Sequence, residues 1–402
     1  MTRDIIRSDK NSRPQEKIQP DYACVLLAGG RSSRMGGRSK ADLSFEDTTI
    51  GRHIEDEMEK TGALCFYSYR EETCRIPEGW IPVKDEYIPD GSAVPESAGR
   101  EVEGPAALGP IAGICRTLEE AEKRGLCGVY VSPCDLPYFR HQMIPMVQAD
   151  ARAGGYDAVL WETRDGRRHY TCGFYSTRCL PAIRKMLEGG DLRLRNLASR
   201  VKTGFLSTEK AGIPDLYLTN VNTMEQYEKL ISANKDPLVL CVCGWKDSGK
   251  TTLLLELVRR VTAAGIKAAV IKHDGHDFEA DYPGTDSFRM KQAGAYGTAV
   301  FSEKKLEIVK EVKVSAGDLV SCFPEADLIL IEGEKNSSYP KIETFRSDSE
   351  RRLSADPATV LAYVRDWEGE DGMFPEGIPV LQNTDGSRIC ELVLRQLDQH
   401  VL

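Results

Sequence analysis

One stretch near the start of the chain constrains its fold more than any other. An apolar run from Ala23 to Ala28 breaks directly into a loop, ending at Lys40, that holds four glycines, three arginines and one lysine. The apolar run is typical of a buried strand. Glycines allow main-chain N–H groups to approach a bulky anion, and Arg34 and Lys40 add fixed positive charge. Because open α/β sheets bind ligands just past the carboxyl ends of their strands, the loop's position favours a nucleoside triphosphate site over a solvated turn.

A carboxylate follows another predicted strand. The run from Cys127 to Ser132 predicts this strand, and Asp135 comes three residues later, between Cys134 and Leu136. An aspartate there can bind Mg²⁺, which proteins hold through one or two carboxylates together with substrate phosphates. The alternative is a turn or helix cap, a common role for aspartate. The basic loop upstream favours the metal interpretation.

The composition narrows the class of protein. A length of 402 residues predicts two domains, and the net charge of −9 argues against a protein that coats nucleic acid through a basic face. No apolar run approaches the ~20 residues that a membrane span needs. The polar start, Met1 to Pro20, predicts a disordered tail rather than a secretory signal. We therefore expect a cytoplasmic protein with neither a nucleic-acid nor a membrane partner.

The cysteines predict core packing rather than a metal site. They number twelve, no CxxC pair occurs, and Cys24, Cys115, Cys241 and Cys243 lie within apolar runs. Such cysteines are usually small core residues in a reducing compartment. Cys241 and Cys243 share one predicted strand, where they would face opposite ways and could not bind a metal together.

A second glycine-containing loop follows a second apolar strand. The polar segment 233–237 reads as a linker, and a predicted strand from Leu238 to Cys243 comes directly after it. The strand runs into Gly-Trp-Lys-Asp-Ser-Gly-Lys-Thr-Thr and then into an amphipathic helix to Ala264, which is a P-loop in its required context. Its main-chain N–H groups cradle phosphates, Lys250 reaches the β- and γ-phosphate oxygens, and Thr251 binds Mg²⁺. The predicted nucleotide-binding residues are Gly244, Asp247, Ser248, Gly249, Lys250, Thr251 and Thr252.

Two later features could belong to the same site. Glu332 ends an apolar strand that begins at Asp327 and occupies the place of a Walker-B acid, which would hold the Mg²⁺ water shell. The alternative is a simple strand-end carboxylate. His273 and His276 follow the predicted strand Ala268 to Ile271 and suggest a metal site, but a polar loop that lines the nucleotide pocket is the favoured interpretation.

The first half also resembles a known family. Leu-Ala-Gly-Gly-x-x-x-Arg-Met-Gly-Gly-x-x-Lys, residues 27–40, resembles the signature loop of molybdenum cofactor guanylyltransferases (MobA), and Gly109–Gly113, Cys134–Pro137 and Asn220–Thr223 resemble its later signatures. Two segments depart from the family: Phe66–Tyr69 lacks an asparagine, and His169–Tyr175, where relatives build the acceptor-binding wall, lacks a proline. The resemblance implies main-chain contacts to GTP, phosphate binding by Lys40 and Mg²⁺ binding by Asp135. The implied nucleotide-binding set is Leu27, Ala28, Gly29, Gly30, Gly37, Lys40, Asp85 and Asp135.

The second half resembles the MobB family, the GTP-binding accessory proteins of molybdopterin-guanine dinucleotide synthesis. The matches span most of residues 238–346 and include Asp286-Ser287-x-Arg289, Ile331-Glu332-Gly333 and Pro340-Lys341-Ile342-Glu343. Glu334 departs, because relatives usually carry an aromatic residue there. The resemblance implies GTP binding, slow GTP hydrolysis and a homodimer formed through this half.

These features predict an α/β protein of two three-layer domains. The first is a Rossmann-like nucleotidyltransferase of the nucleotide-diphospho-sugar transferase type, and the second is a P-loop NTPase domain. We expect a disordered tail at 1–20, the MobA-like domain at 21–232, a linker at 233–237 and the MobB-like domain at 238–402.

The presence of two families from one pathway on one chain selects the acceptor. We expect the first domain to transfer GMP from GTP to Mo-molybdopterin, with Arg34, Lys40 and Mg²⁺ on Asp135 neutralising charge as pyrophosphate leaves. The implied partners are the molybdopterin-type cofactor, molybdoenzyme apoproteins and other cofactor-biosynthesis proteins. Two alternatives remain open: a cytidylyltransferase that uses the same acceptor, and a non-catalytic, nucleotide-dependent adapter that delivers the cofactor.

Overall fold

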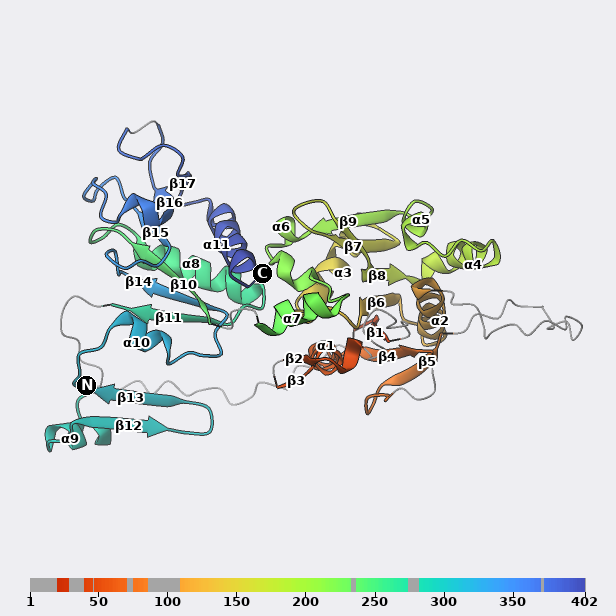
Figure 1. Cartoon of the computed structure of the whole chain (residues 1–402), viewed down its shortest axis with the longest axis horizontal. Coiled ribbons are helices and arrows are strands. Elements are labelled where there is room, and N and C mark those ends of the chain that lie inside the picture. The colour runs from red at the N-terminus through yellow and green to blue at the C-terminus, as the bar shows by residue number, and fades with distance from the viewer. Residues whose placement is uncertain are drawn as a thin grey trace, which may run out of the picture. The chain divides into compact units, whose positions relative to one another are not determined.

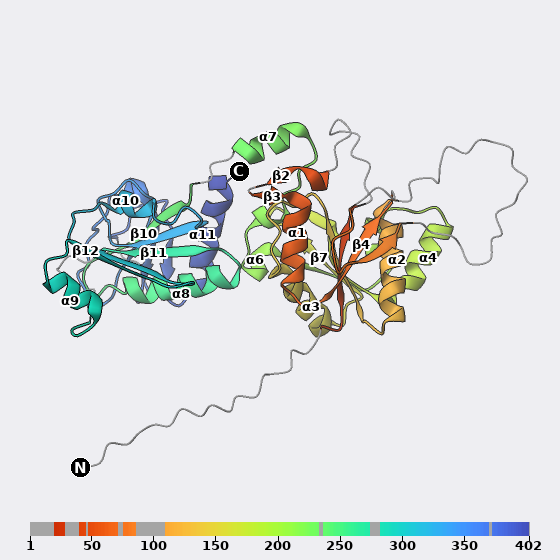
Figure 2. The same ribbon diagram turned by 90° about the horizontal axis from the view of Figure 1, so that it is seen from below.

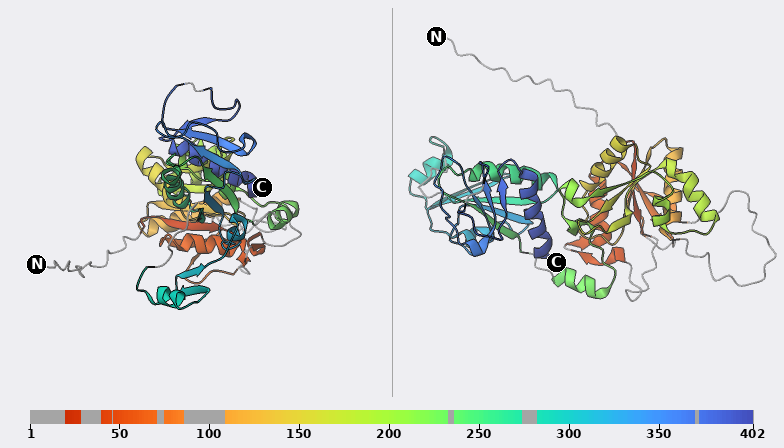
Figure 3. Two further views of the ribbon diagram at one scale, coloured as in Figure 1. Left: turned by 90° about the vertical axis from the view of Figure 1, so that its left-hand side faces the viewer. Right: turned by 90° about the horizontal axis from the view of Figure 1, so that it is seen from above.

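Sheets built from buried apolar strands form the centre of both halves of the chain. The computed structural model describes residues 20–28, 40–45, 47–70, 75–85, 109–232, 236–273, 282–369 and 372–401. The chain divides into two compact units, and the main boundary between them falls after Ser232. Figures 1, 2 and 3 show the elements of each unit.

The first unit is built on a seven-stranded sheet with the order β5-β4-β1-β6-β8-β7-β9. The first four strands in this order are parallel, β8 runs antiparallel to both of its neighbours, and β9 is parallel to β7. Central parallel strands are covered on both faces, which explains why β1 and β6 read as continuous apolar runs. The strands are β1 (Ala23–Leu27), β4 (Leu64–Tyr69), β5 (Ile81–Lys84), β6 (Gly128–Pro133), β7 (Ala158–Glu162), β8 (Arg168–Ser176) and β9 (Thr203–Ser207); a separate small hairpin joins β2 (Ser44–Phe45) and β3 (Thr48–Thr49).

Helices cover both faces of this sheet. Figure 2 shows α2 and α4 on one side of the strands and α1 and α3 on the other. Ile111, Ile114 and Leu118 recur at helical spacing along α2 and pack with Val25 and Val131 in one apolar core. The helices are α1 (Ile50–Glu59), α2 (Pro110–Lys123), α3 (Met143–Gly154), α4 (Leu180–Glu188), α5 (Leu194–Ala198), α6 (Thr208–Ala211) and α7 (Met224–Ser232), with 3-10 turns η2 (Lys40–Asp42), η3 (Thr177–Cys179) and η4 (Asp215–Leu218).

The second unit is built on a six-stranded, all-parallel sheet with the order β11-β14-β10-β15-β16-β17. Helices α8 and α11 pack against each other and against β10. On the face that α10 covers, Leu319 packs with Cys241 and Ile331. The elements are β10 (Leu238–Cys243), β11 (Ala268–Lys272), β14 (Leu328–Glu332), β15 (Lys341–Thr344), β16 (Val360–Arg365), β17 (Val380–Gln382), α8 (Lys250–Ala263), α10 (Ala316–Val320), α11 (Gly386–Val401) and η5 (Pro357–Thr359).

A hairpin lies outside the main sheet of the second unit. Strands β12 (Gly297–Phe301) and β13 (Leu306–Lys310) pair antiparallel with each other alone, and α9 (Asp286–Gln292) packs on β12. Figures 1 and 3 place this hairpin on the side of β11, away from β16 and β17. The sequence patterns discussed above do not predict it.

The predicted fold class is confirmed, with two three-layer α/β units in the expected order. The strands predicted from apolar runs are all present, and their ends differ from the prediction by at most two residues. Cys24, Cys115, Cys241 and Cys243 are buried free thiols, as expected of core residues. Most of the predicted tail, residues 1–19, lies outside the described residues, as does the linker segment 233–235. Within the described parts of the chain, no helix has the length and apolar character to cross a bilayer.

Candidate nucleotide-binding sites

The first unit brings Lys40 and Asp135 together at the carboxyl ends of β1 and β6. Lys40 Nζ donates a 2.9 Å hydrogen bond to Asp135 Oδ2, although the two residues are 95 positions apart. Their side chains are only 21% and 12% exposed. A largely shielded ion pair at this edge supplies a cation for phosphate oxygens and a carboxylate for a metal ion.

Two asparagines hold this ion pair. Lys40 Nζ also donates to Asn222 Oδ1 at 2.7 Å, and Asn220 Nδ2 donates to Asp135 Oδ1 at 2.8 Å. The sequence comparison matched both asparagines to a family signature but gave them no role. Their contacts assign one: they fix where the Lys40 and Asp135 side chains point.

Asp85 follows β5 at the same edge of the sheet, where the parallel strands end. Its N–H donates to the Tyr69 carbonyl at 2.7 Å. Its Oδ1 atom is buried and has no hydrogen-bond partner among the described residues. Burial raises the pKa of Asp85 to about 6, and nearby Arg70 opposes the rise. A buried acceptor without a donor costs free energy, which a ligand with N–H groups would recover.

Gly113 lets α2 pack closely against Ser68, next to Asp85. A Cβ atom on this residue would lie 2.6 Å from Ser68 Oγ, 3.3 Å from Leu27 Cδ2 and 3.6 Å from Asp85 Cγ. Four segments distant in sequence therefore meet at this point. Ser68 occupies part of the segment in which the sequence showed no asparagine, and its carbonyl accepts from the Ala28 N–H at 2.9 Å. That bond leaves the Ala28 carbonyl, rather than its N–H, for any ligand.

Four further residues were predicted for this site, all in the glycine loop. Gly29, Gly30, Arg34 and Gly37 lie outside the described residues. The predicted glycine loop therefore has a described start, Leu27 and Ala28, and a described end, Lys40.

The segment expected to form the acceptor wall is strand β8, next to β6 in the sheet. His169 is 8% exposed, and its Nε2 atom has no hydrogen-bond partner among the described residues. Burial lowers the pKa of His169 to about 4, with a smaller contribution from Arg167. Arg167, just before β8, donates to Asn220 Oδ1 at 3.3 Å. This segment is thus joined to the Asp135 cluster through Asn220.

The second unit forms a P-loop between β10 and α8, as predicted. Lys250 Nζ donates to the carbonyls of Gly244 and Trp245, at 3.2 and 2.7 Å. A Cβ atom on Gly244 would lie 2.5 Å from both the Thr344 carbonyl and Ser248 Oγ, so the start of the loop requires glycine. Asp247 has a φ of 62°, in the left-handed region. The tight loop leads its main chain into the start of α8, where helix N–H groups bind anions.

Thr251 and Glu332 meet at the start of α8. Thr251 Oγ1 donates a 2.9 Å hydrogen bond to Glu332 Oε1, so the predicted Walker-B acid lies beside the P-loop threonine. One hydroxyl and one carboxylate suit Mg²⁺, which keeps most of its water and phosphate ligands. His273 Nδ1 lies 3.2 Å from Glu334 Oε1, whereas His276 lies outside the described residues. Across the described parts of the chain, no three His, Cys, Asp or Glu side chains cluster closely enough to bind a metal without further ligands.

Comparison with known proteins finds a family model that matches part of each half. Residues 24–203 match the MobA-like NTP transferase domain, and residues 239–366 match molybdopterin guanine dinucleotide synthesis protein B. The molybdopterin-guanine dinucleotide biosynthesis adapter protein of Haemophilus influenzae is 36% identical over 138 residues, which cover 33% of this chain and 78% of that protein. A probable molybdenum cofactor guanylyltransferase of Bacillus cytotoxicus is 25% identical over 219 residues, 53% of this chain and 98% of that protein. The crystal structure of Bacillus subtilis MobB covers 39% of this chain and 96% of its own, with 27% identity and a TM-score of 0.34.

Proposed function

We propose that this chain is a bifunctional molybdenum cofactor guanylyltransferase. It belongs to the molybdopterin-guanine dinucleotide biosynthesis adapter family, and a match to the MobA-like NTP transferase domain precedes the adapter-like residues in the sequence. The first domain transfers GMP from GTP to Mo-molybdopterin, and pyrophosphate is released. The observation that carries this proposal is the cluster of Lys40, Asp135, Asn220 and Asn222 at the sheet edge. The domains proposed for these roles are residues 21–232 and 238–402.

The reaction requires charge neutralisation more than covalent chemistry. A phosphate oxygen of the acceptor forms a bond to the α-phosphorus of GTP, the bond from that phosphorus to the bridging oxygen breaks, and pyrophosphate leaves with the electron pair. Lys40, with Arg34, would donate to the departing β- and γ-phosphate oxygens, while Asn222 keeps Lys40 in place. Asp135, oriented by Asn220, would hold Mg²⁺, which would screen negative charge on the α-phosphate and on the leaving group.

Asp85 supports GTP over CTP as the donor. The Watson–Crick edge of guanine carries two neighbouring donors, N1–H and the N2 amino group, which match the two oxygens of one carboxylate. Cytosine has a single amino donor beside an acceptor nitrogen, so a carboxylate would gain one bond and face one lone pair. Since Asp85 Oδ1 is buried and none of the described residues pairs with it, a guanine base would remove an existing penalty.

For the second domain, we propose GTP binding with slow hydrolysis in support of cofactor handling. The P-loop would hold the phosphates, Lys250 the β- and γ-oxygens, and Thr251 with Glu332 the Mg²⁺ ion. The contact between Thr251 and Glu332 supports this assignment. The partners that follow are the molybdopterin-type cofactor and the proteins that supply or receive it.

We also propose that the second domain forms a homodimer through the hairpin of β12 and β13. Phe301 pairs with Leu306 across the hairpin and Ala299 with Ile308, so these four side chains share one face. Phe301, Leu306 and Ile308 are 81%, 68% and 55% exposed. An isolated two-stranded hairpin is marginal in water, and a contiguous apolar face favours association. Sedimentation should give a dimer for the native chain and for Thr298→Asp, on the other face, but a monomer for Phe301→Asp; an unchanged dimer in Phe301→Asp would rule out this interface.

The transferase proposal is tested with the purified full chain, GTP, Mg²⁺ and molybdenum-loaded molybdopterin. Chromatography should detect the guanine dinucleotide and pyrophosphate, and Asp135→Ala should abolish both. Asp150→Ala is the matched control, because Asp150 pairs with Lys210 on the surface. Absence of the dinucleotide would end the proposal, and equal use of CTP would favour the cytidylyltransferase. If Asp135→Ala retained cofactor delivery while Lys250→Ala lost it, the non-catalytic adapter would be the better account.

A further inference from the structure

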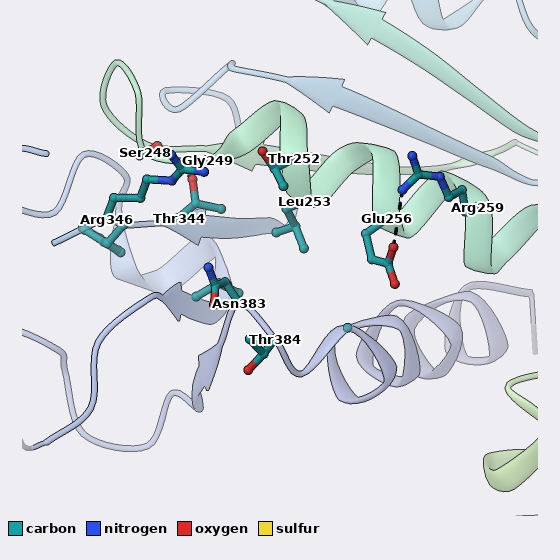
Figure 4. A pocket seen from close by; sticks show the side chains of 13 residues that line it. Ser248, Gly249, Thr252, Leu253, Glu256, Arg259, Thr344, Arg346, Asn383 and Thr384 are labelled. Carbon is teal, nitrogen blue, oxygen red and sulfur yellow. Dashed lines mark hydrogen bonds and ion pairs between the residues drawn. The ribbon is translucent and has the colours of Figure 1, made fainter. Parts of the chain in front are cut away.

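A pocket opens beside the P-loop of the second unit. Figure 4 shows it between the first turns of α8 and the segment that joins β17 to α11, with the P-loop residues Ser248 and Gly249 at one end. Its volume is about 220 Å³. Because P-loop main-chain N–H groups bind phosphates, a ligand whose phosphates lie on this loop could extend directly into the pocket.

The size of the pocket limits what it can enclose. Pockets that enclose a whole drug-sized ligand measure roughly 300–1,000 Å³, so about 220 Å³ accommodates only part of such a molecule. Leu253, Phe345 and Val364 supply apolar walls and are each at most 7% exposed. Apolar walls suit the faces of a flat ring, while the highly charged part of the ligand would remain outside on the loop.

The pocket also carries polar groups from two exposed residues, Asn383 and Thr384, which a ligand can reach from solvent. The Asn383 N–H donates to the Arg365 carbonyl at 2.8 Å, which fixes the loop, but the Asn383 side-chain amide makes no hydrogen bond to the described residues. The Thr384 hydroxyl is likewise unpaired within the described residues. Arg346 lies where the P-loop meets the pocket, since a Cβ atom on Gly249 would be 3.2 Å from its Nε. Its guanidinium has no carboxylate partner among the described residues.

We propose that this pocket binds the base and ribose of a purine nucleotide whose phosphates lie on the P-loop, and that Asn383 recognises the base. The proposal rests on the proposed GTP binding by the second domain. The amide of Asn383 presents a donor and an acceptor side by side, and guanine presents O6 and N1–H in the complementary order. Glu256, the carboxylate that lines the pocket, already pairs with Arg260 at 2.7 Å and with Arg259 at 3.7 Å, so its charge is balanced within the protein.

Photoaffinity labelling of the full chain locates the base directly. With 8-azido-GTP and Mg²⁺, we expect labelled peptides from 252–259, 344–346 or 383–386, and loss of this label in Lys250→Ala. Label in the second domain that depends on Lys250 but lies outside these segments would overturn the pocket assignment and leave nucleotide binding intact. Absence of any label in 238–402 would overturn both the pocket and the proposed GTP site.

Competition against this label then tests Asn383 without interference from the first domain. In Asn383→Ala, the GTP concentration for half-displacement should rise about tenfold, as expected for two lost hydrogen bonds. Displacement by tripolyphosphate, which lacks base and ribose, should stay within about twofold of the native chain. Asn336→Ala, an exposed asparagine outside the pocket, should change neither value. Equal losses for GTP and tripolyphosphate, or no loss for GTP, would refute the role of Asn383.

Discussion

Replacement of Asp85 by asparagine should stabilise the first unit while it impairs the enzyme. Burial raises the pKa of Asp85 from 3.8 to about 6. At ~1.36 kcal/mol per pKa unit this shift corresponds to about 3 kcal/mol, and partial exposure to solvent reduces it to about 1–2 kcal/mol. Because the folded state binds this proton more tightly than the unfolded state, the stability present below pH 4 is lost as the pH rises through about 6. Asparagine keeps the shape of the side chain and carries no charge.

We therefore expect Asp85→Asn to raise the free energy of unfolding of the first unit by about 1–2 kcal/mol at pH 8 and by less than about 0.5 kcal/mol at pH 4. Urea unfolding followed by pulsed hydrogen exchange and mass spectrometry reports the two units through separate peptides. Asp150→Asn, which removes a surface partner of Lys210, should change stability by less than about 0.5 kcal/mol at both pH values. A loss of stability at pH 8, or an equal gain at both pH values, would refute the reasoning.

Asp85→Asn should also raise the KM for GTP about tenfold or more, because the asparagine amide presents a donor where guanine also presents donors. His169 predicts the opposite pH dependence: its pKa falls from 6.5 to about 4 on burial, so stability is present above 6.5 and is lost as the pH falls toward 4. In His169→Gln, the free energy of unfolding of the first unit should fall by about 2–3 kcal/mol less between pH 6.5 and pH 4 than in the native chain. The same unfolding assay measures this, and an unchanged pH dependence would contradict it. Gly113→Ala should raise the KM for GTP and destabilise the first unit by about 1–3 kcal/mol, since its Cβ would lie 2.6 Å from Ser68 Oγ. Ser68→Ala in the same chain should restore most of that stability, and additive losses in the double variant would show that the two side chains do not collide.

Short stretches of sequence were sufficient for the architecture. A buried strand, a glycine-rich turn and a lysine lie within residues 23–40, and a strand, P-loop and helix lie within residues 238–264. Each stretch encodes its own local structure, because apolar runs form central strands and glycine permits the turn that follows. The hairpin of β12 and β13 was not predicted, since its exposed apolar face follows neither a buried-strand pattern nor an amphipathic helix.

The site residues that act together could be identified singly but not as a group. Lys40 and Asp135 were predicted from their positions after strands, and Asp85 from the family resemblance. The contact of Lys40 with Asn222, however, spans 182 positions. Asn383 and Arg346 belong to no motif, and only the pocket beside the P-loop draws attention to them. The sequence by itself determined which strands are buried and where the glycine-containing loop after each of them begins. Tertiary structure alone decided which side chains meet at the sheet edge, because that depends on the strand order, and strand order is set by packing between distant segments.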